Sequence, residues 1–273
     1  MGEAAVLKPA PFQYVAPRSL DEALGALGED AKPLAGGQSL VPLLNFRLAR
    51  PATIVDLNGI VGELAYLRRS DGALRIGALT RQATLERSRV VARGWPLLVQ
   101  AVRHVAHPAI RNRGTVGGSV AHADPAAELP VALTALDASF HVRSAQRGTR
   151  TIAAPDFFQA PLMTALAPDE LLVEIEVPPV PGGARTGFAE HARTHGDFAV
   201  AGAAVVRAGT EHAAIALLGA GPTPLRVPDA ERALRRGASA TEAARIAGAE
   251  VDDDWRRALV TELVRRAIEE ASA

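Results

Sequence analysis

The alternation of apolar and polar residues predicts a β-α-β-α-β order over the first 58 residues. The predicted strands cover 9–16, 32–35 and 53–56, and the predicted helices cover 20–27 and 40–48. Ser19 precedes the first helix, with Glu22 three positions on, which is the pattern of a capping box. Gly36-Gly37 falls between a strand and a helix, at the kind of junction where helix N-termini bind anions.

From residue 59 to residue 178 the pattern is that of hairpins and helices. Leu64–Arg68 and Leu74–Ile76 alternate on either side of Ser70-Asp71-Gly72, which is a hairpin signal. Helical spacing predicts helices over 80–87, 96–105 and 126–136, the first of them capped by Thr80. Strands are expected over 139–143, 149–152 and 171–177, and the run PPVPGG at 178–183 is the best candidate for a linker.

After this linker the chain places strands before helices. The strands are predicted over 186–192, 199–208 and 212–218, and the helices over 229–235, 241–249 and 254–271. Asp252-Asp253 precede the last helix, and we interpret them as its cap rather than as a metal site, because negative charge is favourable at a helix N-terminus. The whole order predicts an α+β fold with units at 1–58, 59–178 and 184–273.

Two glycine-rich segments carry the candidate chemistry. The segment Arg113–Pro130 reads RGTVGGSVAHADPAAELP, and the segment Pro33–Leu40 reads PLAGGQSL. Glycine adopts positive φ readily, so we expect Gly117-Gly118 and Gly36-Gly37 to form turns in which backbone N–H groups converge on an anion. Two such turns can clamp a pyrophosphate, and the alternative interpretation is two tight turns between strands.

Polar side chains flank the second glycine pair. Thr115 and Ser119 offer hydroxyl donors that suit a phosphate oxygen. Asp124 and Glu128 follow, and as ionised carboxylates they only accept hydrogen bonds, so they suit sugar or ribityl hydroxyls. Neither turn contains Lys or Arg, so backbone dipoles would supply most of the positive potential.

Composition narrows the classes of function. The 273 residues, 48% of them hydrophobic, can bury the cores of two or three compact units. Lys plus Arg and Asp plus Glu number 30 each, so nucleic-acid and anionic-membrane binding are not expected. The absence of cysteine excludes disulfides and cysteine-ligated iron–sulfur clusters on this chain. Because no signal peptide and no apolar run of roughly 18 residues is found, we expect a cytoplasmic protein.

The histidines do not predict a metal site. His104 and His107 lie three residues apart at a helix end, but no third ligand is evident and Pro108 follows at once. Ser119 lacks the strand–elbow–helix context of a hydrolase nucleophile. We therefore expect neither a metal site nor a catalytic Ser-His-Asp triad on this chain.

Three segments carry a family resemblance that extends over nearly the whole chain. They are AGGQSLVPLLNFRLARP at 35–51, IRNRGTVGGSVAHADPAAELP at 110–130 and RTHGDFAVAGAAVV at 193–206. In this order and spacing they resemble the FAD-binding middle subunit of molybdenum hydroxylases, the group of aerobic carbon monoxide dehydrogenases and xanthine dehydrogenases. The resemblance implies a two-part FAD-binding domain of the vanillyl-alcohol-oxidase/PCMH type, followed by a small α+β C-terminal domain.

The same resemblance implies contacts with FAD residue by residue. In the family the first loop wraps the pyrophosphate, the second loop faces it, the acids that follow contact the ribityl chain, and a strand residue meets the flavin through its backbone. The cofactor-binding residues implied here are Leu34, Ala35, Gly36, Gly37, Gln38, Ser39, Leu40, Thr115, Val116, Gly117, Gly118, Ser119, Asp124, Glu128 and Leu172. The turn Gly196-Asp197-Phe198 matches a segment near the isoalloxazine ring.

The resemblance also implies partners. The molybdenum cofactor and the 2Fe–2S clusters would lie on a molybdopterin large subunit and an iron–sulfur small subunit, in a dimer of heterotrimers. Electrons would pass from the clusters to the FAD of this chain and on to NAD, a quinone, oxygen or another external acceptor. Two alternatives stay open, namely a self-contained FAD-dependent oxidoreductase with its own substrate site and a flavin-free scaffold subunit.

Overall fold

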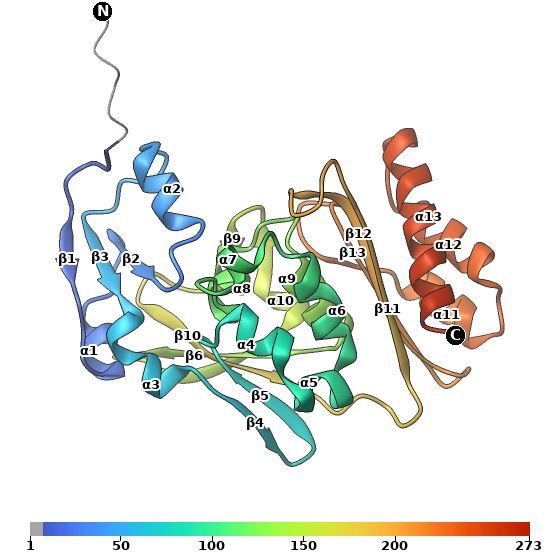
Figure 1. Ribbon diagram of the computed structural model, residues 1–273, viewed down its shortest axis with the longest axis horizontal. Helices are drawn as coiled ribbons and strands as arrows, with labels where there is room; N and C mark the ends of the chain where they lie inside the picture. The colour runs from blue at the N-terminus through green and yellow to red at the C-terminus, as the bar shows by residue number, and fades with distance from the viewer. Residues whose placement is uncertain (1–7) are drawn as a thin grey trace, which may run out of the picture.

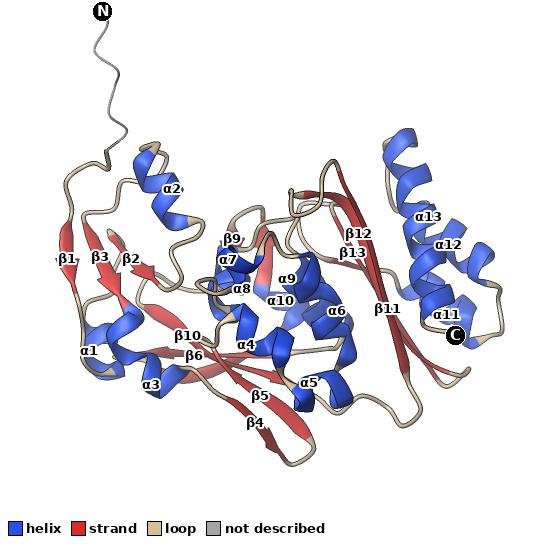
Figure 2. Cartoon of the chain, in the orientation of Figure 1, coloured by secondary structure: helices blue, strands red, loops and turns tan. Residues whose placement is uncertain are grey.

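The computed structural model describes residues 8–273 and shows three regions in a row along the chain's long axis (Figure 1). Each region is built around its own β-sheet, and each region also contains helices (Figure 2). In this part of the chain no helix is long and apolar enough to cross a membrane.

The N-terminal region is a small parallel sheet with short helices. Its strands lie in the order β1 (Gln13–Val15), β3 (Thr53–Asp56), β2 (Ala31–Leu34), and its helices are α1 (Leu20–Gly25), α2 (Leu40–Asn45), the 3₁₀ helix η1 (Leu57–Ile60) and α3 (Val61–Leu64). The predicted β-α-β-α-β order is confirmed. Ser19 caps α1 by accepting the Glu22 N–H at 3.2 Å, while the Glu22 side chain accepts the N–H of Arg18 instead of completing the box on Ser19.

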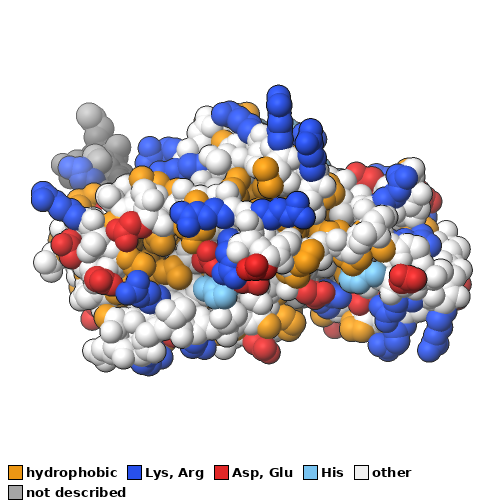
Figure 3. Space-filling model, turned by 90° about the horizontal axis from the view of Figure 1, so that it is seen from below, with side chains coloured by type: hydrophobic (Ala, Val, Ile, Leu, Met, Phe, Trp, Pro, Cys, Tyr) orange, Lys and Arg blue, Asp and Glu red, His pale blue; other side chains and the backbone are white. Residues whose placement is uncertain are grey.

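The central region is an antiparallel five-stranded sheet with helices on one face (Figure 1). Its strand order is β4 (Leu67–Ser70), β5 (Ala73–Gly77), β10 (Glu170–Val177), β6 (Ser139–Ser144), β7 (Gly148–Ala153), and a separate hairpin pairs β8 (Phe158–Ala160) with β9 (Met163–Thr164). The helices are α4 (Gln82–Arg87), α5 (Arg89–Gly94), α6 (Pro96–His104), α7 (Pro108–Arg111), α8 (Val116–His122), α9 (Glu128–Ala135) and α10 (Ala154–Phe157). Figure 3 shows the molecule from below, where charged side chains of both signs are interspersed.

Helix α4 begins later than the sequence predicts. Its N-cap is Arg81, and the predicted cap Thr80 has another role. The Thr80 hydroxyl donates to the Tyr66 carbonyl oxygen at 2.9 Å and accepts the Tyr66 N–H at 3.1 Å. The prediction of Thr80 as a cap is wrong because this hydroxyl fastens the segment before β4 to the segment after β5.

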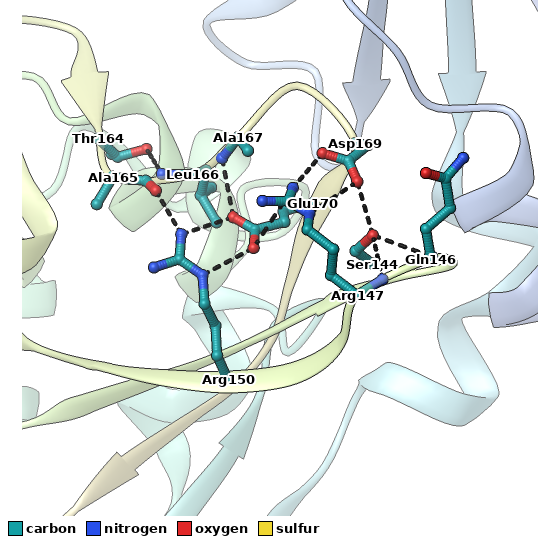
Figure 4. A network of polar contacts seen from close by, with 10 residues as sticks. All are labelled: Ser144, Gln146, Arg147, Arg150, Thr164, Ala165, Leu166, Ala167, Asp169 and Glu170. Carbon is teal, nitrogen blue, oxygen red and sulfur yellow. Dashed lines mark hydrogen bonds and ion pairs between the residues drawn. The ribbon is translucent and has the colours of Figure 1, made fainter.

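A polar network fixes the start of β10, the central strand of this sheet (Figure 4). The buried Glu170 carboxylate accepts from Nε and Nη2 of Arg150, each at 2.8 Å, and from the Ala167 N–H at 2.8 Å. Asp169 accepts from the Ser144 hydroxyl at 2.6 Å. The hydrogen bonds from Arg150 lower the pKa of Glu170 despite its burial. The carboxylate therefore stays ionised and holds the strand end in place.

The C-terminal region is an antiparallel sheet with three helices on its outer side (Figure 2). Its elements are β11 (Arg185–Ala192), β12 (Ala199–Ala208), β13 (His212–Leu218), β14 (Leu225–Arg226), α11 (Pro228–Arg235), α12 (Ala240–Gly248) and α13 (Asp254–Glu270). Successive residues of β12 alternate between two cores, since Val205 packs with the helices and Val206 packs with the central region. Asp253 accepts the Arg256 N–H at 2.6 Å, which confirms it as the cap of α13.

Candidate functional site

The first glycine segment is an open loop between β2 and α2. Gly37 has a φ of +76°, so the predicted positive φ is confirmed at this residue. The backbone N–H groups of residues 36–40 donate to no acceptor within residues 8–273. Consecutive backbone donors that the chain leaves without an acceptor are able to bind an anion.

The second glycine segment is the first turn of a helix. Thr115 is the N-cap of α8, and its hydroxyl accepts the third N–H of the helix at 3.0 Å. The N–H groups of residues 116–119 are all used inside the chain, on the Thr80, Ala78 and Thr115 carbonyls and the Thr115 hydroxyl. Neither Gly117 nor Gly118 has a positive φ. The prediction of a turn with free N–H groups is therefore wrong for this segment.

Close packing explains why this helix carries glycine. A Cβ on Gly117 would lie 2.6 Å from the Cβ of Ala78 and 2.7 Å from its carbonyl oxygen. A Cβ on Gly118 would lie 2.6 Å from Thr115 Oγ1, the atom that caps the helix. These distances are shorter than any ordinary carbon contact. Gly117 therefore lets α8 rest on the segment that follows β5, and Gly118 leaves room for the capping hydroxyl of Thr115.

The structure brings the two glycine segments together. A Cβ on Gly36 would overlap the Arg113 carbonyl oxygen and would lie 2.8 Å from the Cα of Gly114. A Cβ on Gly118 would lie 3.7 Å from the Cβ of Ala35. The unbonded N–H groups of the first segment thus stand beside the hydroxyl-bearing first turn of α8.

The two predicted carboxylates follow α8 in the chain. Asp124 is half-buried, and its Oδ1 accepts the Ala126 N–H at 2.8 Å. Glu128 is the first residue of α9 and is 7% exposed. Burial raises the pKa of the Glu128 carboxyl to about 8, and the charge of Glu190 adds to the shift. Burial thus favours the neutral form of Glu128 near neutral pH, and a neutral carboxyl can donate as well as accept a hydrogen bond.

Leu172 lies on β10 beside the second glycine segment. Its side chain is buried in the central core, while that of its neighbour Leu171 packs in the N-terminal core. The carbonyl oxygen of Val173 accepts the Ala78 N–H at 3.0 Å, and the Ala78 carbonyl oxygen accepts the Gly117 N–H at 2.9 Å. β10 and α8 are therefore joined through one residue, and a ligand there would meet the backbone of Leu172 rather than its side chain.

The turn at Gly196-Asp197-Phe198 connects β11 to β12 and contacts the central region at His107. Gly196 has a φ of +83°, and a Cβ there would lie 2.6 Å from His107 Cε1. The ring of His107 faces that of His195 at a centroid distance of 6.3 Å. Phe198 is 73% exposed at the end of this turn. The turn thus presents an apolar side chain to solvent at the edge of the central region.

His104 and Glu190 form a polar pair whose charges affect the pKa of Glu128. His104 Nδ1 is 3.2 Å from Glu190 Oε1, and this hydrogen bond raises the pKa of His104. The other oxygen of Glu190 is buried and has no partner among residues 8–273. His104 and His107 therefore have separate neighbours rather than a common ligand.

The central sheet carries a group of possible metal ligands on its less buried face. Ligand atoms of His141, Glu174 and Glu176 lie within 4.8 Å of one another. Arg75 pairs with Glu174 at 2.7 Å and with Glu176 at 2.9 Å, and the Tyr66 hydroxyl donates to Glu174 at 2.8 Å. Since Arg75 already balances these carboxylates, we interpret the group as an ion-pair network of the sheet.

Sequence reasoning missed two side chains that contact the glycine segments, Asn58 and Arg81. Asn58 donates to the Ala35 carbonyl oxygen at 3.0 Å, and Arg81 donates to the Arg113 carbonyl oxygen. Asn58 was findable, because polar residues just beyond the carboxyl ends of neighbouring parallel strands meet at one sheet edge. No local pattern marks Arg81, whose partner lies 32 residues away.

Unbonded backbone N–H groups beside a hydroxyl-bearing helix turn, with two carboxyl groups later in the chain, are groups that a cofactor with a pyrophosphate and a hydroxylated chain requires. The first segment offers unbonded N–H groups to an anion, and Asp124 and Glu128 offer carboxyl groups to hydroxyls. Gly36 keeps side-chain atoms out of the space between the two segments.

Comparison with known proteins agrees with this chemistry. Residues 10–180 match the family described as FAD binding domain in molybdopterin dehydrogenase. The chain is 47% identical over 236 residues to the 6-hydroxypseudooxynicotine dehydrogenase complex subunit alpha of Paenarthrobacter nicotinovorans, covering 84% of this chain and 79% of that protein. It is 40% identical over 285 residues to the nicotine 6-hydroxylase medium subunit of the same organism, covering 98% and 99%.

A solved structure shows the same fold. Carbon monoxide dehydrogenase from Hydrogenophaga pseudoflava, in a form that lacks the Mo-pyranopterin moiety of the molybdenum cofactor, has a chain with a TM-score of 0.90 and 38% identity, covering 97% of this chain and 98% of that one. The predicted α+β, PCMH-type FAD-binding fold and the family resemblance are confirmed. The chain belongs to the family of FAD-binding domains of molybdopterin dehydrogenases.

Proposed function

We propose that this chain is the FAD-carrying electron-transfer subunit of a multi-subunit molybdenum hydroxylase, and that residues 36–40 bind the pyrophosphate of FAD. The observation that carries the proposal is the run of backbone N–H groups in this loop that have no acceptor within residues 8–273. A phosphate oxygen accepts such hydrogen bonds, and the glycines allow it to approach the backbone.

The second segment would contact FAD through side chains instead of N–H groups. The Thr115 hydroxyl accepts from the Gly118 N–H and keeps its own proton for a ligand oxygen. The Ser119 side chain is half-buried, and its hydroxyl makes no hydrogen bond to residues 8–273. We assign both hydroxyls to the face of FAD opposite the first loop.

Asp124 and Glu128 would bind the ribityl chain. Asp124 Oδ1 is engaged in its own turn, and Oδ2 is available to a ligand hydroxyl. Burial raises the pKa of Glu128 to about 8, and in its neutral form the carboxyl would donate to one ribityl oxygen and accept from another. We assign the backbone of Leu172 to the flavin ring, and its side chain packs in the core that it shares with α8.

The position of this chain in an electron pathway follows from its composition and its relatives. Bound FAD supplies reversible uptake of one or two electrons, and the residues of this chain bind and orient it. The chain has no cysteine, so cysteine-ligated iron–sulfur clusters that feed it lie on another chain. The relatives are named as subunits of complexes, which favours this function over a self-contained oxidoreductase.

The proposal extends to partners and to domain limits. We assign an iron–sulfur small subunit and a molybdopterin large subunit as partners, in a cytoplasmic dimer of heterotrimers that passes electrons to an external acceptor. The domain limits are 1–58, 59–178 and 184–273. The three separate sheets and the position of PPVPGG between β10 and β11 support this division, while η1 and α3 extend the N-terminal core beyond residue 58 to residue 64.

The absorbance spectrum of the purified chain tests the proposed function. We expect flavin absorbance, and heat treatment followed by chromatography should release about one FAD per chain. A colourless protein that fails to bind added FAD, both alone and with its neighbouring subunits, would contradict the assignment and favour a flavin-free scaffold.

A further inference from the structure

Two side chains outside both glycine segments connect them by hydrogen bonds. Asn58 Nδ2 donates to the carbonyl oxygen of Ala35, directly before the first glycine pair, at 3.0 Å. Arg81 Nη2 donates to Asn58 Oδ1 at 2.9 Å, and Arg81 Nη1 donates to the carbonyl oxygen of Arg113, at the start of the second segment. A continuous path therefore runs from one segment through Asn58 and Arg81 to the other.

Asn58 is held on the N-terminal region. It belongs to η1, directly after β3, and both its N–H and its Nδ2 donate to Asp56 Oδ1, at 2.9 and 2.6 Å. The Tyr14 hydroxyl donates to the other oxygen of Asp56. Burial acts to raise the pKa of Asp56, but these hydrogen bonds offset burial and lower it, so Asp56 is a charged anchor at neutral pH.

Arg81 is held on the central region. It is the N-cap of α4 and forms an isolated antiparallel bridge with Thr115. The Gln82 N–H donates to the Gly114 carbonyl oxygen at 2.9 Å, so the backbone around Arg81 is bonded to the second segment as well. The guanidinium thus reaches across from the central region to the N-terminal region.

These bonds fix the direction of the N–H groups in the first loop. In a trans peptide the C=O and the following N–H point to opposite sides. Because Asn58 holds the Ala35 carbonyl on one side, the Gly36 N–H points to the other. Gln38 Nε2 donates to the Gly36 carbonyl oxygen at 2.8 Å and fixes the Gly37 N–H in the same way. The carbonyl groups are thus held back from the space that the donors face.

We propose that Asn58 and Arg81 are positioning residues for flavin binding. Together they set the separation of the two glycine segments and the peptide orientation of the first one before FAD arrives. This inference rests on the proposed function, since it concerns the same site. Neither residue needs to touch the cofactor, because their hydrogen bonds go to backbone oxygens, to each other and to Asp56. Preorganised donors bind more tightly because less ordering is lost on binding.

The test measures FAD affinity of the full-length apo chain for Asn58→Ala, Arg81→Lys and the double variant. Arg81→Lys keeps the positive charge but cannot span two acceptors with one planar group. We expect each single substitution to raise the Kd of FAD about 10-fold. The Kd of the double variant should rise by much less than the product of the two single-variant increases, because both residues belong to one hydrogen-bonded path.

Arg226→Lys is the matched control for loss of stability. Arg226 also joins a side chain to a backbone carbonyl, since it donates to Glu231 at 2.7 Å and to the Thr134 carbonyl oxygen at 3.1 Å, away from both glycine segments. We expect the thermal stability of the Arg226→Lys variant to fall while its Kd for FAD stays within about twofold of the wild-type value.

Three results would overturn the inference. They are an unchanged Kd in both single variants, a Kd for Arg81→Lys equal to wild type with only Asn58→Ala affected, and a loss of affinity in Arg226→Lys as large as in Arg81→Lys. A wild-type chain that binds no FAD would instead overturn the proposed function.

Discussion

The two glycine segments share a sequence pattern but use glycine for different physical reasons. In the first segment Gly37 adopts positive φ, and the N–H groups of residues 36–40 have no acceptor in residues 8–273. In the second segment Gly117 and Gly118 are helical, and the N–H groups of residues 116–119 are all bonded. The first pair therefore makes a binding loop, and the second pair makes a close contact.

This difference separates affinity from stability in the two segments. A side chain at Gly37 changes the loop that binds the ligand but meets only Val41 and Leu34 side chains, at 3.2 and 3.3 Å. A side chain at Gly117 meets the backbone and the Cβ of Ala78, which cannot move away. A substitution at Gly37 should thus lower ligand affinity, whereas a substitution at Gly117 should lower stability.

The largest effect is expected at Gly117. Gly117→Val should destabilise the fold by about 3 kcal/mol or more, since the new side chain overlaps Ala78 at 2.6–2.8 Å. Chemical denaturation of the apo chain measures this loss. A variant with wild-type stability that has lost only FAD would show that the second segment is a binding loop like the first.

The next largest effect is expected at Gly37, and it falls on affinity. Gly37→Ala should weaken FAD binding by about 2 kcal/mol, because alanine disfavours a φ of +76° and the loop must change shape to relieve it. Titration of the apo chain with FAD measures the change. Gly72→Ala is the control, since Gly72 has a φ of +83° in the β4–β5 hairpin, and equal losses of affinity in both variants would contradict the prediction.

A smaller effect is expected from the carboxylate after the second segment. Asp124→Ala should weaken FAD binding by about 1.5 kcal/mol, as the loss of one charged acceptor would. Asp124→Asn, which keeps an acceptor oxygen, should weaken FAD binding less than Asp124→Ala does. If the Kd is unchanged in both variants, Asp124 does not belong to the ribityl site.

Counted per pH unit, the smallest effect is a pH dependence of stability at Glu128. Its pKa is raised from 4.5 to about 8 in the folded state, so the stability it contributes is complete below pH 4.5 and is lost as the pH rises through 8. Relative to Glu128→Gln, the wild-type protein should therefore lose about 1.4 kcal/mol of stability per pH unit between pH 5 and pH 8. Denaturation of both apo proteins at several pH values measures this difference, and parallel curves would show that Glu128 ionises normally.

The sequence predicted the regular elements because their patterns are local. Strands β11 to β13 and helices α11 to α13 follow from hydrophobic spacing, and the caps Ser19 and Asp253 follow from one side chain each. Short helices such as α5, α7 and α8 were not predicted, since four to seven residues carry little periodicity.

The parts that sequence could not give depend on contacts between distant residues. Glycine at position 117 can adopt either a turn or a helical conformation, and packing on Ala78 selects the helix. The Thr80 hydroxyl could cap α4 or bond another segment, and in the structure it donates to the Tyr66 carbonyl oxygen. The bonds of Arg81 span 23 and 32 residues, so no local pattern indicates them.

Hydrogen exchange of the apo and FAD-loaded chain tests the central claim most directly, because it observes the backbone N–H groups themselves. We expect the amides of residues 36–40 to exchange rapidly in the apo chain and to become protected when FAD binds, while those of residues 116–119 are protected in both states. If FAD binds and the amides of residues 36–40 exchange as rapidly as before, these donors do not hold the pyrophosphate.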